Sequence, residues 1–200
     1  MLLPLLVGMV MSGCSDAHSS LPTGTTTRRV SAGGWVFVPA GAALREQCRS
    51  TARSLGYPVP CLRKVPRQMG RLGGLAFIGQ GPPGSWRQWA VGSTSVGPEH
   101  LVTTASPRRL SSDAKVVNGP AWYPRARVQP MGRVTINGWR MHAVYVPPAT
   151  NDGSAFAHHV VLIWTVGDHT YGFGFHNLRG LRITLQLDKE LARHLILVGP

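Results

Sequence analysis

The chain has 200 residues, 43% of them hydrophobic, and carries 21 Lys and Arg against 8 Asp and Glu, a formal net charge of +13. This length suits one globular domain with a tail. The excess of Arg either reflects a genome rich in G and C or favours a polyanionic partner. No zinc-finger or aromatic RNA-binding motif is present, and the acidic residues are scattered, which argues against specific nucleic-acid recognition and a glycosidase pair.

Residues 2–11 form an uncharged apolar run that is too short to cross a bilayer but typical of an export signal. Residues 11–14 read Met-Ser-Gly-Cys and resemble the lipobox of bacterial lipoproteins, whose usual pattern is Leu-(Ala/Ser)-(Gly/Ala)-Cys. The resemblance implies a signal peptide over residues 1–13, cleavage before Cys14 and acylation of the Cys14 thiol, for example with palmitate. It further implies a protein held at the outer face of the bacterial cytoplasmic membrane; secretion without an anchor is the alternative.

Residues 14–33 combine the cysteine of the lipobox with a Ser- and Thr-rich stretch that has little apolar content and no periodicity. We interpret this stretch as a flexible tether, because such a composition cannot bury enough apolar surface to fold. Residues 34–200 are expected to form a single globular α+β domain.

The stretch over residues 41–61 predicts a helix followed by a returning segment. Apolar residues recur at helical spacing before a terminating Gly56, at Leu44, Cys48, Ala52 and Leu55. Cys48 and Cys61 form an even pair in an exported chain, which favours a disulfide over two buried free thiols.

A second stripe on this helix consists of Arg45, Arg49 and Arg53. These side chains could contact an anionic ligand, either lipid headgroups or a cell-wall polymer. The alternative is an ordinary solvated helix face.

From residue 73 the pattern is mostly that of β-strands, beginning with short strand-like runs at residues 74–79, 87–92 and 100–105. The intervening Gly-Gln-Gly-Pro-Pro-Gly at residues 79–84 has the glycine order of a dinucleotide-binding turn. Pro83 restricts the residue before it to extended geometry, and no helix follows, so we interpret the segment as a connector between antiparallel strands.

Two hairpins follow. Asn137-Gly138 predicts a type I′ turn that pairs Ile136 with Trp139 and Val134 with Met141 on an apolar face. A second two-residue turn at Gly167-Asp168 predicts pairs on one face between Trp164 and Tyr171, Leu162 and Phe173, and Val160 and Phe175.

The opposite face of the second hairpin carries Gly172 and Gly174, which leave room for either a packed helix or a ligand. On that face His159 is expected directly opposite His176, and two imidazoles at this spacing could form half of a metal site. His142 or a residue of the tail is a candidate third ligand, whereas His158 is expected on the other face. The competing interpretation is that these are structural or surface histidines. A metal-binding protein or an envelope enzyme that uses the His159/His176 face is therefore the alternative function.

Residues 183–195 predict a final helix, with Thr184 as its cap and with Leu187, Leu191 and Leu195 along one side. The body of the chain resembles uncharacterised secreted envelope proteins of actinobacterial type, through Leu-Gly-Tyr-Pro-Val-Pro-Cys at residues 55–61 and a hairpin with Trp164, Gly167 and Tyr171 before a helix. The expected fold is α+β: a mainly antiparallel sheet built from hairpins, with one N-terminal and one C-terminal helix packed on it.

These features together favour a lipid-anchored cell-envelope protein that acts as a non-catalytic binding or support module for an anionic envelope ligand. Its expected partners are the membrane, through the lipid anchor, and anionic lipid or a wall polymer. Because no cofactor-binding motif is present in the sequence, we expect no cofactor.

Mass spectrometry of the mature N-terminus tests the anchor. We expect a chain that begins at Cys14 and carries the mass of its acyl chains, because the thiol is the acceptor. A Cys14→Ser chain should lack that mass and should move to the aqueous phase in a detergent partition. An unmodified Met1 would contradict the anchor, the tether and the exported location together.

Overall fold

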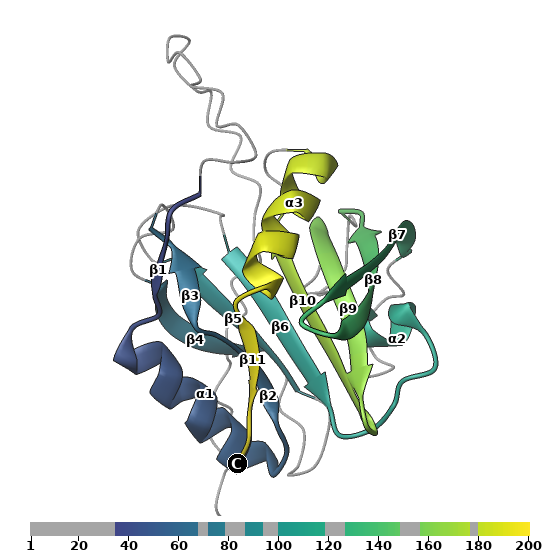
Figure 1. Cartoon of the computed structure of the whole chain (residues 1–200). Coiled ribbons are helices and arrows are strands. Elements are labelled where there is room, and N and C mark those ends of the chain that lie inside the picture. Colours follow the sequence, from purple (N-terminus) through teal and green to yellow (C-terminus); the bar gives the residue numbers. More distant parts are fainter. Residues whose placement is uncertain are drawn as a thin grey trace, which may run out of the picture. The chain divides into compact units, whose positions relative to one another are not determined.

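The computed structural model describes residues 35–67, 72–78, 87–93, 100–118, 127–148, 157–176 and 180–200 (Figure 1). Of residues 72–78, 87–93, 100 and 118 it describes the backbone alone. All of these residues belong to one compact unit, Ser31–Pro200. The predicted signal peptide, Cys14 and the tether lie outside the described residues, as does the connector at residues 79–84.

Seven antiparallel strands form the main sheet, in the order β4-β5-β6-β10-β9-β8-β7 (Figure 1). The prediction of a mainly antiparallel sheet is thereby confirmed. The strands are β4 (Leu72–Ile78), β5 (Arg87–Ser93), β6 (His100–Ser106), β7 (Gln129–Ile136), β8 (Trp139–Val146), β9 (His159–Val166) and β10 (His169–His176).

Both predicted hairpin registers are confirmed. Strands β7 and β8 pair Ile136 with Trp139 and Val134 with Met141, across a turn in which Asn137 and Gly138 have φ of 52° and 78°. Two positive φ values match the right-handed strand twist, so the turn sets the register. Strands β9 and β10 likewise place Trp164 opposite Tyr171, Leu162 opposite Phe173 and Val160 opposite Phe175.

Two small sheets were not predicted. Strand β1 (Phe37–Pro39) pairs with β3 (Lys64–Pro66), and β2 (Val59–Leu62) pairs with β11 (Leu195–Val198), both antiparallel. These strands are only three or four residues long, too short for a hydrophobic alternation to stand out in the sequence. Each pairing joins segments that are distant in the sequence or separated by a helix.

Helix α1 (Ala42–Leu55) buries the predicted stripe of Leu44, Cys48, Ala52 and Leu55, and it ends at Gly56, whose φ is 76°. The predicted disulfide is present and joins Cys48 of α1 to Cys61 of β2. The helix packs mainly against β2 and β11 and not, as expected, on the main sheet. The short β2–β11 sheet, which the sequence pattern did not reveal, occupies the place beside this helix.

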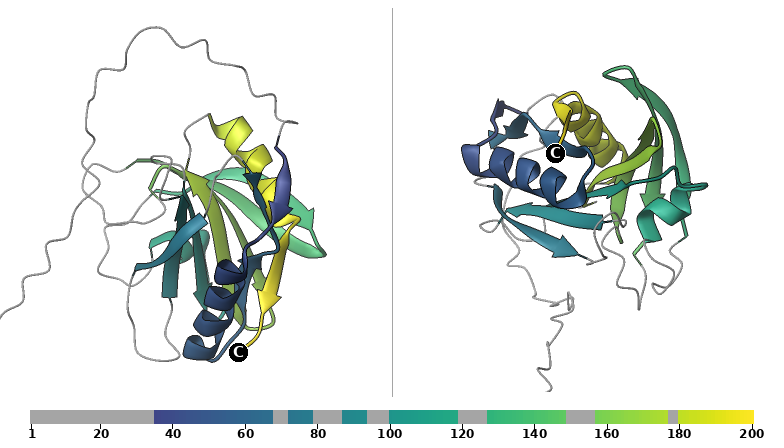
Figure 2. Two further views of the ribbon diagram at one scale, coloured as in Figure 1. Left: turned by 90° about the vertical axis from the view of Figure 1, so that its left-hand side faces the viewer. Right: turned by 90° about the horizontal axis from the view of Figure 1, so that it is seen from below.

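Helix α3 (Leu181–Ala192) lies against β9 and β10 (Figures 1 and 2). It begins earlier than predicted, because Gly180 with φ of 92° turns the chain directly into the helix. Thr184 is therefore not the cap; its hydroxyl donates to the carbonyl of Gly180 one turn back, at 3.0 Å. Leu195 is buried as expected, but it begins strand β11 and not the last turn of the helix.

A short third helix, α2 (Asp113–Asn118), was not predicted, and it packs against β8 and β10. Its Val116 and Val117 form a buried cluster with Val161 and Ile163, on the glycine-bearing face of the second hairpin. A larger cluster on the opposite face joins that hairpin to α1, α3 and the β2–β11 sheet. A helix, and not a ligand groove, therefore approaches the glycine-bearing face.

Gly174 is required by the close pairing of β10 with β9. A Cβ added there would lie 2.4 Å from the carbonyl oxygen of Val160 and 2.9 Å from Cγ2 of Val161. We expect Gly174→Ala to lower the free energy of unfolding by about 1–3 kcal/mol, because backbone and a packed side chain must move. Urea unfolding measures the loss. Gly199→Ala, where an added Cβ meets nothing within 4 Å, is the matched control, and equal stability of both variants would contradict the packing.

Candidate functional site

The arginine stripe of α1 is partly neutralised by its own helix. Glu46 pairs with Arg49 at 3.1 Å and with Arg53 at 2.8 Å. The hydrogen bonds from Arg53 and Arg49 lower the pKa of the Glu46 carboxyl, which is fully exposed. Arg45 donates to the carbonyl oxygen of Ala40. An anionic ligand would have to compete with these contacts, so the stripe is a weaker candidate than the sequence indicated.

The disulfide borders a small hollow with room for about one water molecule. It is mostly apolar, and nothing in it points to a ligand of larger size. Its lining comes from α1, β2, β6, β10 and β11, through Leu44, Cys48, Pro60, Cys61, Leu62, Leu101, Thr103, Phe173 and Leu195. The hollow is therefore a packing feature and not a binding pocket.

The histidine pair lies where the register predicted. His159 is opposite His176, and their rings meet edge to face with centroids 4.9 Å apart. Contrary to expectation, His158 does not lie apart from them: its φ is 59°, and its ring centroid is 5.0 Å from that of His176. The predicted third ligand, His142, instead contacts the Asp113 carboxylate at 3.2 Å.

Among the side chains that the structure describes, no group of three or more His, Cys, Asp or Glu is arranged to hold a metal ion. Nδ1 of His159 is 2.7 Å from the Ala157 carbonyl oxygen, which fixes this ring against the backbone. Ring packing and a backbone hydrogen bond thus position these imidazoles, and neither contact supports the metal-binding alternative.

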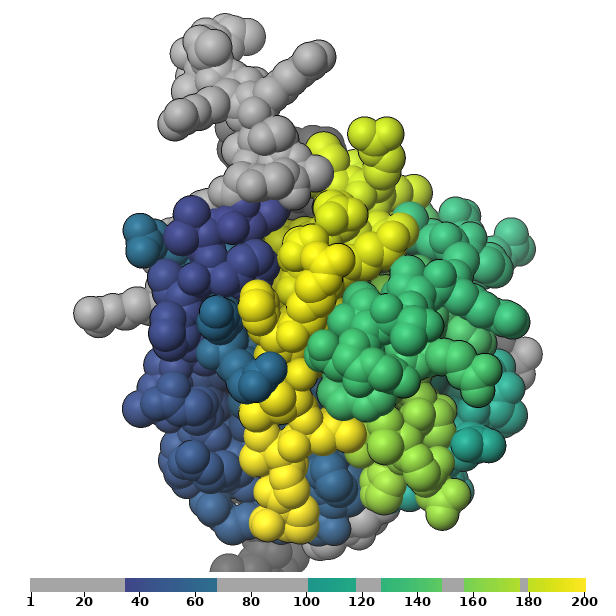
Figure 3. Space-filling view, in the orientation of Figure 1, coloured from purple at the N-terminus to yellow at the C-terminus, as the bar shows by residue number. Residues whose placement is uncertain are grey.

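A different group of cations, which the sequence reasoning missed, gathers where β1, β3 and the end of α3 meet. We call it the basic patch, and it consists of Arg63, Lys64, Arg67, Arg193 and His194. All four Lys and Arg side chains of the patch are exposed. Figure 3 shows the first strands and the α3–β11 segment side by side on one face.

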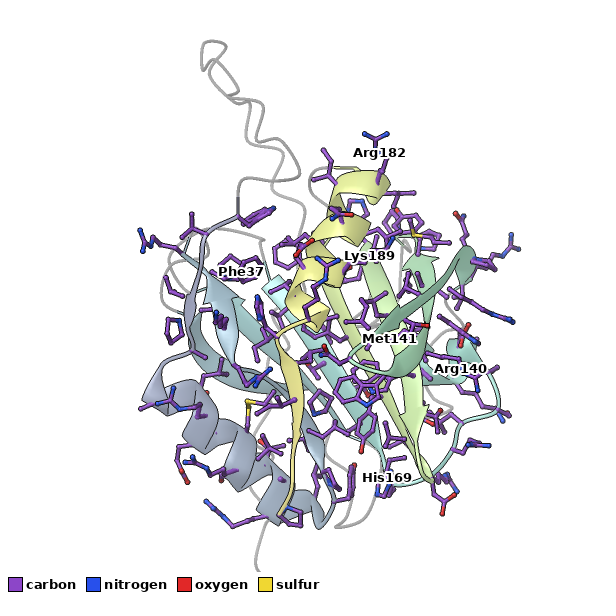
Figure 4. The ribbon with its side chains drawn as sticks, in the orientation of Figure 1. Phe37, Arg140, Met141, His169, Arg182 and Lys189 are labelled. Atoms are coloured by element: carbon purple, nitrogen blue, oxygen red, sulfur yellow. A yellow bond between two sulfur atoms is a disulfide. The ribbon has the colours of Figure 1, made fainter. Side chains whose placement is uncertain are left out.

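Backbone hydrogen bonds hold the basic patch together. The Arg63 amide donates to the His194 carbonyl at 2.9 Å, and the Ala40 amide donates to the Arg63 carbonyl at 2.9 Å. The Phe37 ring lies against the His194 ring with centroids 4.7 Å apart. In Figure 4 Phe37 on β1 and Lys189 on α3 are both on the side turned to the viewer. Three segments distant in the sequence thus converge on one surface.

The positive charges of the basic patch act on the pKa of the His194 imidazole. Partial burial lowers the pKa of its imidazole, and the positive charges of Lys64, Arg63 and Arg193 lower it further. Glu190 opposes them, although Glu190 is itself ion-paired with Arg193. A positive field disfavours the charged form of the imidazole. A bound anion would offset the repulsion between the cations of the basic patch, so this surface favours anion binding.

The sequence held only a weak signal for this patch. Arg63-Lys64 and Arg193-His194 are two basic dipeptides 130 residues apart, and neither is unusual in a chain with 21 Lys and Arg. Their meeting depends on two pairings, β1 with β3 and β2 with β11, which no local pattern predicted.

One buried acid stands apart from these surfaces. Asp188 is fully buried on the inner side of α3, and burial raises the pKa of its carboxyl well above the usual range; the Phe175 amide partly offsets this. Burial therefore favours the neutral form of this carboxyl, because desolvation penalises the charged form.

Comparisons with protein-family models, with curated proteins and with solved structures gave no match for this chain. Within the described ranges, no helix combines the length and apolarity needed to span a bilayer. The function is therefore inferred from the chain's own surfaces.

Asp188 should make the stability of the protein depend on pH. The unfolded carboxyl ionises near pH 4, whereas the folded one holds its proton to a higher pH. The unfolding free energy should therefore fall as pH rises from about 4 towards the raised pKa. Denaturant unfolding of Asp188→Asn across this range should lack that fall. Asp168→Asn, an exposed turn residue, is the control, and identical pH profiles of Asp188→Asn and the native chain would contradict the assignment.

Proposed function

We propose that this protein is a lipid-anchored module of the bacterial cell envelope that binds an anionic envelope ligand through the basic patch. The observation that carries the proposal is the convergence of exposed Arg63, Lys64 and Arg67 beside His194, whose carbonyl accepts the Arg63 amide at 2.9 Å. Burial lowers the pKa of the His194 imidazole, and the charges of Lys64, Arg63 and Arg193 lower it further against the opposing charge of Glu190. The net charge of +13 supports it, because a strongly basic protein attracts polyanions at long range.

Export from the cytoplasm is supported by the lipobox-like residues 11–14 and by the disulfide between Cys48 and Cys61. Structural disulfides persist in oxidising compartments and are rare in reducing ones. Acyl chains at Cys14 would hold the domain at the membrane, since two chains give stable anchoring where one gives only reversible binding. The proposed module is non-catalytic and acts by binding or by supporting another envelope component.

The basic patch is a better candidate than the arginine stripe because of the counter-charges. Glu46 already pairs with two of the three arginines of the stripe. In the basic patch, Arg63, Lys64 and Arg67 form no ion pair with any side chain that the structure describes, and all three are exposed. An anion that binds to these three cations displaces water and counterions, and it does not first have to break an ion pair; the fourth cation, Arg193, is already paired with Glu190.

The test uses the full chain with Cys14→Ser, so that no acyl chain contributes to retention. Its binding to anionic vesicles or to a wall fraction should fall as salt rises, because screening weakens exposed charge pairs. The triple variant Arg63→Gln, Lys64→Gln, Arg67→Gln should bind at least about tenfold more weakly, since each cation near an anionic surface contributes about 1 kcal/mol. Sedimentation at several salt concentrations measures both effects.

The matched control removes three exposed arginines elsewhere, Arg127→Gln, Arg133→Gln and Arg140→Gln, and changes the net charge by the same amount. Arg140 lies on the β7–β8 hairpin, away from Phe37 and the basic patch (Figure 4). Equal losses in the two triple variants would mean that net charge, and not this patch, governs binding. Retention that does not depend on salt, or no retention at all, would contradict the proposed function.

A site-specific readout accompanies the binding measurement. An anion bound among Lys64, Arg63 and Arg193 should raise the pKa of His194 toward its ordinary value, because it counters the field that lowers it. An NMR titration of His194 with and without linear polyphosphate measures this shift. Binding that leaves the titration of His194 unchanged would place the anion elsewhere.

A further inference from the structure

An exposed apolar side chain borders the basic patch. Trp35 and Val36 are the first residues described, and we call them the N-terminal edge. Val36 is 49% exposed, the more exposed of the two large hydrophobic side chains that stand out on the described surface. Its carbonyl accepts the Arg67 amide at 2.7 Å, and Pro39 further along the strand lies opposite Lys64. Apolar and cationic groups therefore share one surface.

The proposed function leaves two anionic ligands open, an anionic lipid surface and a soluble or wall polymer. An exposed apolar side chain beside cations distinguishes between them. A soluble polyanion would engage the cations but would gain nothing from an exposed valine. A bilayer with anionic lipids offers both headgroup phosphates and an acyl boundary where an apolar side chain can be buried. Each Lys or Arg close to such a surface strengthens binding by about fivefold. The observed surface therefore fits a bilayer better than a polymer.

The position of the N-terminal edge supports the same ligand. Twenty residues separate Cys14 from Trp35. A flexible chain of that length spans roughly 25 Å on average, whereas a folded unit of about 165 residues is roughly 40 Å across. Electrostatic attraction fades beyond a Debye length of about 8 Å. A chain anchored at Cys14 would therefore bring the N-terminal edge, with the basic patch beside it, closer to the bilayer than the far side.

We propose that the basic patch and the N-terminal edge form one membrane-docking surface, and that its ligand is the anionic lipid surface of the bilayer. The inference rests on the proposed function, of which it names the ligand. Val36 enters the headgroup region while Arg63, Lys64 and Arg67 contact lipid phosphates. The anchor and the docking surface then act as two linked membrane contacts, and the second becomes effectively intramolecular once the first has formed.

The experiment places a fluorophore at Val36 in the full chain. In a Cys14→Ser background, Val36→Cys supplies the one free thiol, because Cys48 and Cys61 are joined. An environment-sensitive label there should shift to the blue with phosphatidylglycerol vesicles at low salt. It should not shift with phosphatidylcholine vesicles or with linear polyphosphate. Thr135→Cys, exposed on the β7–β8 hairpin, carries the control label and should shift with none of them.

A second variant separates the apolar contact from the charges. Val36→Asp removes the apolar side chain and adds a negative charge, so its affinity for phosphatidylglycerol vesicles should fall roughly tenfold. Its affinity for linear polyphosphate should fall much less, because a soluble polyanion gains nothing from burying Val36. Thermal unfolding checks that the exposed substitution leaves the fold intact.

The remaining outcomes distinguish failure of the membrane-docking surface from failure of the proposed function. Vesicle binding without a shift of the label at Val36 means that another face docks, which overturns this inference and leaves the charge-based function standing. Binding of polyphosphate but not of vesicles has the same consequence and identifies a polymer ligand. Binding to neither probe removes both the docking surface and the proposed function.

Discussion

The structure depends on the burial of both faces of the β9–β10 hairpin. On one face Trp164, Tyr171 and Phe173 are almost completely buried in the larger core cluster, beneath α3. On the other, Val161 and Ile163 are buried in the second cluster with α2. Within the hairpin itself, the close pairing of β10 with β9 requires Gly174, because a side chain there would meet the backbone of β9.

The position of the basic patch follows from that packing. Once α3 lies against β9 and β10, its last turn leads directly into β11, and β11 pairs with β2. The disulfide joins β2 to α1 and closes a short loop in the sequence. In the chain-entropy model this stabilises the folded state by about 3 kcal/mol. The chain then continues into β3, which pairs with β1. His194 and Arg63 are neighbours because each lies at a junction of this path.

Local counter-charge, more than the number of cations, separates the two basic surfaces. Glu46 lies one turn from Arg49 and two turns from Arg53, so the helix that carries the stripe also carries its partner. In the basic patch, Glu190 pairs with Arg193, and the pKa of His194 is still lowered by Arg63 and Lys64. A net charge of +13 favours the attraction of anions at long range, and the arrangement of acids distinguishes the two basic surfaces.

The sequence by itself determined those features whose physical cause is local. The turn at Asn137-Gly138 sets the register of β7 and β8 through two positive φ values, and the spacing of Leu44 to Leu55 sets the buried face of α1. An even cysteine pair in a chain that we expect to be exported indicated the Cys48–Cys61 disulfide, which the structure contains. Only the tertiary structure decided that Leu195 begins β11 and does not continue α3, which helix covers the glycine-bearing face, and where Arg63 meets His194. Those outcomes depend on pairings between short strands distant in the sequence, whose stability comes from a shared core that no local pattern records.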